Sequence, residues 1–153
     1  MLRPVPLSEK GDLHTRFEAY RRDYYDLVHP GEALEPYPWF DGYWTEQDRH
    51  PSWITAGDEV AGFVLVNGWA ESGLPLDQAI GEFCILPDHR RHGLGLKAVV
   101  ALMALHTGQW ELKVHHANLP GMAFWPRALA AAGAKNPSQI EGSDSLILRF
   151  QTP

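Results

Sequence analysis

Residues 82–95 read EFCILPDHRRHGLG, and residues 96–105 continue as LKAVVALMAL. The first segment is apolar until it reaches a turn with two glycines, and the second is rich in alanine and leucine. This order predicts a strand, a tight loop at 90–95 and a helix that leaves the loop directly. The free N–H groups of such a loop and the dipole of the helix point at one spot, which favours an anion.

The residue types in the loop fit a phosphate ligand. Gly93 and Gly95 have no side chains, so a diphosphate could approach the backbone closely, while Arg90 and Arg91 add positive charge at the rim. The pattern differs from the familiar phosphate loops, because no Lys-Ser or Lys-Thr follows and a third glycine is missing. A plain turn between a strand and a helix is the alternative.

The rest of the chain predicts further strands and helices. Apolar and aromatic residues recur at steps of three and four from Leu13 to Leu27, which predicts a helix capped by Ser8 or Asp12 and ended by His-Pro-Gly at 29–31. Residues 30–51 combine prolines with aromatics and predict a long functional loop. The further predicted strands are 52–57, 60–69, 78–86, 110–116 and 145–150, with a hairpin turn at Gly57-Asp58, and the further helices are 94–107 and 120–132.

Composition limits the class of protein. The 153 residues, 44% hydrophobic and 21% charged, indicate one globular domain over 1–153. The longest apolar run is too short to cross a bilayer and no signal peptide is evident, so we expect a cytoplasmic protein without a membrane partner. A net charge of −6 argues against a nucleic acid partner.

Cysteine and histidine usage gives no sign of a metal site. The single cysteine, Cys84, has apolar neighbours, which favours a buried side chain over a nucleophile. The histidines at 89, 92, 115 and 116 lack the spacing of known metal motifs, so we expect no metal.

Two linked motifs carry a resemblance to a known family. Residues 85–95, ILPDHRRHGLG, place Arg-x-x-Gly-x-Gly after a strand, and residues 118–125, NLPGMAFW, place an aromatic pair six residues after an asparagine. Over residues 81–127 the chain resembles the GNAT superfamily of acetyl-CoA-dependent N-acetyltransferases, in particular predicted bacterial members. The resemblance implies an α/β (α+β mixed) fold, in which about four helices flank a mixed, mostly antiparallel sheet of six to seven strands, splayed in the middle.

The resemblance implies acetyl-CoA as co-substrate and assigns its contacts. The loop N–H groups hold the CoA diphosphate, the strand end pairs with the pantetheine arm, and the second motif supplies a polar contact and an apolar wall. These residues are, in that order, Arg90, Arg91, His92, Gly93, Leu94 and Gly95; Cys84 and Ile85; and Asn118 and Phe124. Asn118 also suits a helix cap, and both roles can hold at once.

Glu82 is the candidate catalytic base, because it stands just before the strand end, where many members of the family have a glutamate. The alternative is a solvated or salt-bridged strand residue. His115 and His116 are reserve candidates, of which alternation places only one on the active face; His116 is retained as the second catalytic candidate. Many members have a tyrosine acid where this chain has Trp125, and an indole has no comparably acidic proton.

The acceptor side is expected in the aromatic loop. Tyr37, Trp39 and Tyr43, with carboxylates nearby, suit a cationic amine, although rings of this kind can equally fill a core or form a homodimer contact. The sequence thus predicts an N-acetyltransferase that acts on a primary amine of a small molecule or peptide by direct attack on the thioester. A noncatalytic acyl-CoA-binding or regulatory module on the same fold is the alternative.

Overall fold

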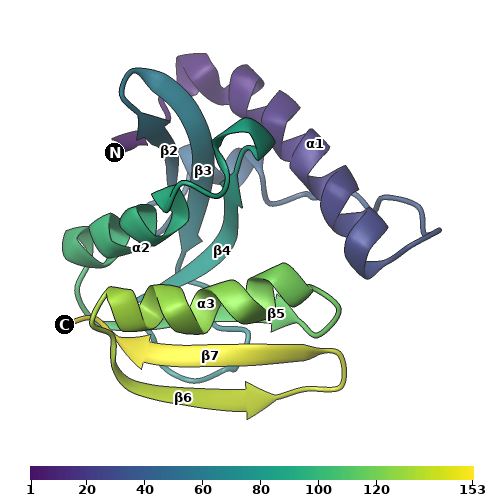
Figure 1. Ribbon diagram of the computed structural model, residues 1–153. Helices are drawn as coiled ribbons and strands as arrows, with labels where there is room; N and C mark the ends of the chain where they lie inside the picture. Colours follow the sequence, from purple (N-terminus) through teal and green to yellow (C-terminus); the bar gives the residue numbers. More distant parts are fainter.

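One mixed sheet forms the centre of the protein in a computed structural model that describes residues 1–153 (Figure 1). Its strand order is β1-β2-β3-β4-β5-β7-β6, and only the neighbours β4 and β5 run parallel. The strands are β1 (Leu2–Pro4), β2 (His50–Ala56), β3 (Glu59–Asn67), β4 (Gln78–Ile85), β5 (Gln109–His115), β6 (Lys135–Glu141) and β7 (Ser145–Gln151). The expected mixed, mostly antiparallel sheet is confirmed.

Three α-helices accompany the sheet, one fewer than the resemblance implied. They are α1 (Lys10–Val28), α2 (Leu94–Leu105) and α3 (Leu119–Ala131), with single 3-10 turns η1 (Leu7–Glu9), η2 (Asp41–Trp44) and η3 (Pro87–His89). Helix α1 ends before Pro30 as predicted, but Glu9 stands at its N-cap without a side-chain bond, so neither Ser8 nor Asp12 caps it. The loop over 30–49 holds only the short turn η2.

The two faces of the sheet carry two separate cores. Leu112 and Val114 of β5 pack with α2 and α3 in an aliphatic cluster that also contains Trp110 and Trp125. On the opposite face, Phe63 and Leu65 of β3 pack with Phe17 of α1 in a cluster rich in aromatic rings. Because strand side chains alternate between faces, α1 and the pair α2 and α3 cover opposite sides of the sheet.

The sheet splits between its two parallel strands. Residues 78–80 of β4 pair with residues 110–112 of β5. Beyond these three pairs the two strands run on to Ile85 and His115 without pairing with each other. The splayed centre is therefore confirmed. We call the facing edges of the two strands beyond Ile80 and Leu112 the split. Figure 1 shows β4 rising away from β5 at this point.

A bulge in β4 decides which side chains reach the split. Val66 pairs with Ile80 and Leu65 with Glu82, so Gly81 has no partner on β3. The extra residue reverses the alternation: Ile80 packs on the α2 and α3 face, whereas Glu82 points to the α1 face. A Cβ on Gly81 would lie 2.7 Å from Nδ2 of Asn67 and 3.0 Å from the hydroxyl of Tyr43, so any larger residue would displace these two hydrogen-bonded groups.

Strand β6 was absent from the sequence prediction. All seven of its residues are exposed, so it lacks the alternation by which a half-buried strand is recognised. It contains Pro137, which is tolerated because β6 is an edge strand with a register shift between Lys135 and Ser138.

Candidate active site

The glycine loop at 90–95 connects η3 to the first turn of α2. Gly93 is the N-cap of α2 in the left-handed conformation, with φ of 73°, and makes no side-chain cap bond. Arg91 also has a positive φ, 68°, which a non-glycine residue seldom adopts. The initial N–H groups of α2 thus have no side-chain cap, as a helix terminus that binds an anion requires.

Two contacts hold the loop against the strand end and α3. The Nε of Arg90 donates to the carbonyl oxygen of Ile85 at 2.8 Å. A Cβ on Gly95 would lie 3.0 Å from the ring of Phe124, which in turn stacks on Phe83 with centroids 5.7 Å apart. Glycine at 95 therefore lets the loop and the aromatic wall of the predicted cradle approach each other closely.

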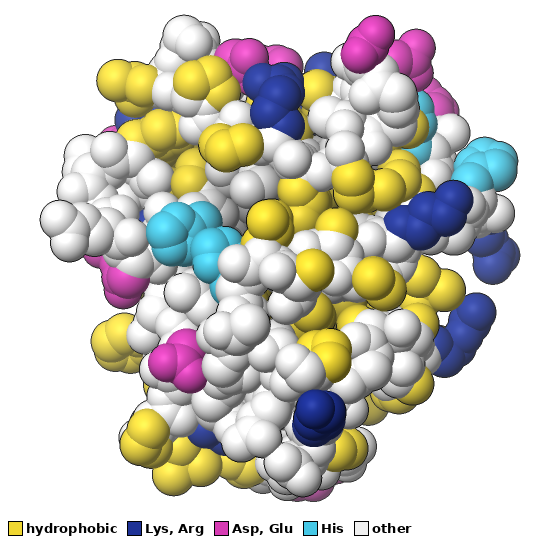
Figure 2. Space-filling model, turned by 90° about the vertical axis from the view of Figure 1, so that its left-hand side faces the viewer, with side chains coloured by type: hydrophobic (Ala, Val, Ile, Leu, Met, Phe, Trp, Pro, Cys, Tyr) yellow, Lys and Arg dark blue, Asp and Glu magenta, His cyan; other side chains and the backbone are white.

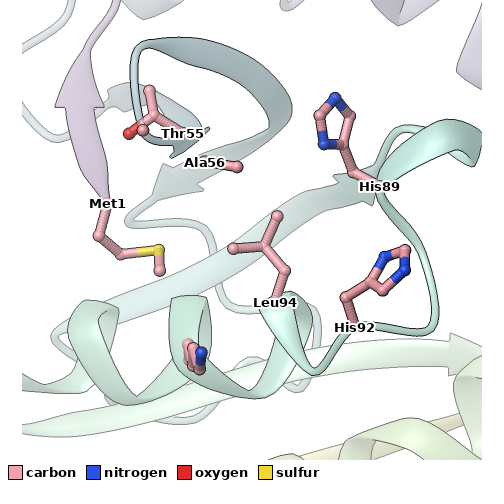
Figure 3. A pocket seen from close by; sticks show the side chains of 8 residues that line it. Met1, Thr55, Ala56, His89, His92 and Leu94 are labelled. Carbon is pink, nitrogen blue, oxygen red and sulfur yellow. The ribbon is translucent and has the colours of Figure 1, made fainter.

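A first cavity, the loop cavity, lies beside the glycine loop. Its volume is about 460 Å³, and Figure 3 shows His89, His92 and Leu94 on one side with Met1, Thr55 and Ala56 on the other. Lys97 of α2 is the one lysine or arginine in the lining. His89 also approaches Glu59 to 3.9 Å.

A second cavity, the split cavity, of about 350 Å³, lies at the split of the sheet. Its lining comes from α1, the 35–39 segment, the end of β3 and the loop after it, strands β4 and β5, and α3 with its N-cap. Since Tyr20 of α1 and Trp125 of α3 both line it, the cavity passes through the sheet from one face to the other. Its main polar and aromatic members are Tyr20, Arg21, Tyr24, Tyr25, Glu35, Tyr37, Trp39, Asn67, Trp69, Glu71, Glu82, Glu111, Lys113, His115, Asn118 and Trp125.

Glu82 lies in the split cavity with an uncommon environment for a carboxylate. The Tyr20 hydroxyl donates to its Oε2 at 2.7 Å. Burial raises the pKa of Glu82 to about 7, although the Tyr20 hydrogen bond and the nearby Arg21 and Lys113 lower it in part. A carboxyl group with this pKa is half ionised near neutrality, which suits a general base.

The neighbouring tyrosines stay protonated. Burial, followed by the charge of Glu82, raises the pKa of Tyr24 to about 12, and burial also raises the pKa values of Tyr20 and Tyr37. These hydroxyls are hydrogen-bond donors at neutral pH. Tyr20 therefore orients the carboxylate of Glu82 without competing with it for protons.

The structure brings fewer than half of the predicted residues to the two cavities: Glu82, Asn118, Tyr37 and Trp39 line the split cavity, and His92 and Leu94 line the loop cavity. His116 lies outside the split cavity, where its Nε2 is 3.0 Å from Oε2 of Glu141 on β6; His115 lines the cavity instead. Tyr43 is buried below it, and its hydroxyl accepts a hydrogen bond from Nδ2 of Asn67. Tyr37 and Trp39 do line it.

Residues of the second motif hold the α3 side of the split cavity. Asn118 lines it and caps α3, since its Oδ1 accepts from the N–H of Gly121 at 3.0 Å. Trp125 lines it too, 5.2 Å from the ring of Phe83, whereas Phe124 contacts the loop. The side chain of Cys84 is buried in the aromatic core, and burial raises its thiol pKa to about 11.

Several cavity residues were not anticipated as site residues. Tyr20 and Tyr24 were counted as the apolar face of α1, and a helical period cannot separate a ring that packs from a ring that lines a cavity. Trp69 and Lys113 gave no sequence signal, because only the fold places them in the split cavity with Glu82.

The family comparison assigns the chain. Residues 13–130 match the model of the acetyltransferase (GNAT) family, so the chain belongs to this family of N-acetyltransferases, which use acyl-CoA and acetylate amines. No curated protein matches the sequence.

Solved structures agree in fold. An acetyltransferase from Thermus thermophilus superimposes with a TM-score of 0.70 at 19% identity, over 100% of this chain and 96% of the other. An aminoglycoside acetyltransferase in complex with coenzyme A and kanamycin gives 0.66 at 18%, over 99% and 94%. An N-acetyltransferase from Thermoplasma acidophilum in complex with coenzyme A gives 0.64 at 13%, over 99% and 98%.

Two further properties concern location and charge. None of the helices has the length and apolar character needed to cross a membrane. On the face seen in Figure 2, basic and acidic side chains are scattered among apolar ones and form no continuous basic surface.

Proposed function

We propose that the protein is an acetyl-CoA-dependent N-acetyltransferase in which Glu82 is the general base for a primary amine of a small molecule or peptide. The observation that carries the proposal is the position of Glu82 in the split, bonded to Tyr20, with its pKa raised to about 7. Glu82 has no cationic partner within ion-pair distance at the point where the two parallel strands separate, so no salt bridge accounts for a carboxyl group there.

The residues present fit CoA. The loop supplies N–H groups of an uncapped helix start, and Arg90 and Arg91 add charge for the diphosphate. His92 and Lys97 line the adjacent loop cavity, where Lys97 would add positive charge near the phosphates. The unpaired edge of β4 at Cys84 and Ile85 would hold the pantetheine arm between Asn118 and Phe124.

Bound acetyl-CoA supplies the acetyl group as a thioester, which the amine attacks directly. Glu82 accepts the proton that the amine loses as its nitrogen bonds to the acetyl carbon and the carbon–sulfur bond breaks. Tyr20 is a positioning residue, because it holds Oε2 of Glu82. The leaving thiolate takes a proton from water, which a thiol with a pKa of about 8.5 allows near neutral pH.

A noncatalytic CoA-binding module is the second candidate, favoured by one observation. Trp125 is buried and lines the split cavity at the position where many family members have a tyrosine acid. Such a module would bind CoA tightly and release no thiol with any amine.

Thiol release from acetyl-CoA across a library of primary amines separates the two candidates. We expect turnover by the natural sequence and a loss of roughly 10²–10³-fold in kcat for Glu82→Gln, since a positioned base contributes about that much. CoA affinity should be equal in both proteins. Tight CoA binding without thiol release from any amine would contradict the catalytic proposal.

A further inference from the structure

Aromatic rings form most of the wall of the split cavity on the α1 side. Tyr20, Tyr24 and Tyr25 come from α1, and Tyr37 and Trp39 from the following loop. Tyr37 contacts Trp39 edge to face, with centroids 5.1 Å apart, and the guanidinium of Arg21 lies 5.4 Å from the Tyr37 ring. This wall offers stacking surface to a flat apolar group.

Trp69, on the loop after β3, also lines the split cavity. Its side chain is 71% exposed, yet its backbone is fixed, because its N–H donates to Oδ1 of Asn67 at 2.9 Å. Three residues later, Ser72 donates twice to the buried carboxylate of Glu111, which also pairs with Arg149. An exposed indole on a loop tied down on both sides is placed to contact a ligand rather than to fill a core.

The charges around the cavity select against a carboxylate on the ligand. Every cationic side chain in the lining already has an acidic partner: Arg21 pairs with Glu18, Lys113 with Glu71, and His115 approaches Asp144. Glu82 in the cavity and Glu35 at its edge have no cationic partner within ion-pair distance. An anionic group bound here would lose its water without gaining a counter-ion.

The same distribution of paired and unpaired charges favours one ammonium group in the cavity. Glu82 is the single inward carboxylate without a cation, whereas Glu35 is exposed to solvent. The volume of about 350 Å³ is at the low end for small-molecule sites and also has to admit the thioester. The acceptor therefore has to be small.

We propose that the acceptor is an arylalkylamine, a primary amine on a short chain that ends in one aromatic ring and carries no carboxylate. The inference rests on the proposed N-acetyltransferase function. The amine meets Glu82, and the ring lies between the tyrosine wall and Trp69.

Four matched amines test the inference by calorimetry in the presence of CoA and by thiol release from acetyl-CoA. 2-Phenylethylamine should bind at least tenfold more tightly than phenylalanine, which adds only a carboxylate. 2-Phenylethylamine should also bind more tightly than butylamine, which lacks the ring. It should bind more tightly than 1,4-diaminobutane too, which lacks the ring and has a second cation. Equal or weaker binding than any of the three would overturn the inference.

A variant pair locates the binding site of the ring. Trp69→Ala should weaken 2-phenylethylamine binding roughly threefold to tenfold, the usual range for one aromatic contact, with butylamine affected less than twofold. Leu7→Ala, which also removes a largely exposed side chain but lies in η1 outside the cavity, should change neither. Unchanged 2-phenylethylamine binding in Trp69→Ala would contradict the placement.

Failure of the arylalkylamine inference can be told apart from failure of the proposed function. If acetyl-CoA does not raise the melting temperature more than phosphate of equal ionic strength, the acetyltransferase proposal fails. If it does and the amine ranking is wrong, only the arylalkylamine inference fails.

Discussion

The glycine loop and the split cavity are built in opposite ways. The loop is a run of consecutive residues, and what it offers is mainly backbone: uncapped N–H groups and two positive φ angles. The split cavity collects side chains from segments as far apart as Tyr20 and Trp125. The donor site can therefore persist while acceptor side chains vary, which explains why the loop alone says nothing about the acceptor.

The bulge at Gly81 is where the acceptor side depends most on the fold. Gly81→Val places a Cβ 2.7 Å from Nδ2 of Asn67 and should break the hydrogen bond from Asn67 to Tyr43. Urea denaturation should show a loss of about 2–3 kcal/mol in the free energy of unfolding. Gly11→Ala, a helical glycine with free space, should instead be neutral or stabilising by about 0.5–1 kcal/mol. A stability loss no greater than that of the control would show that the bulge tolerates a side chain.

A second pair of glycine variants tests the glycine loop. Gly93→Val strains a φ of 73° and should destabilise the protein by about 1–2 kcal/mol while weakening CoA binding roughly tenfold. Gly31→Val, with a φ of 79° and the same free space, should cost similar stability and leave CoA binding unchanged. If calorimetry gave the same CoA affinity for Gly93→Val and Gly31→Val, the glycine loop would not be the binding site of the diphosphate.

The same contrast separates the features that could be predicted from the sequence from those that could not. The loop, the hairpin at Gly57-Asp58 and the cap at Asn118 are predicted correctly because their signals lie within a few neighbouring residues. The exposed edge strand β6 lacks a buried face, so its period carries no information.

The candidate site divides along the same line. The resemblance pointed to Glu82, but its bond to Tyr20 depends on the bulge at Gly81 and on the packing of α1, which no local pattern encodes. Alternation predicted that one of His115 and His116 faces the active side. In the structure it is His115 that lies on this side, because it shares a face of β5 with Glu111 and Lys113.

The pH dependence of kcat/KM for the best amine acceptor, compared with Glu82→Gln, tests the central claim most directly. Only the ionised carboxylate accepts a proton, so the rate should rise with pH and show an inflection near the pKa of Glu82, about 7. The variant should be slower and lack that inflection. The same inflection in Glu82→Gln, or an unchanged rate, would contradict the assignment of Glu82 as the base.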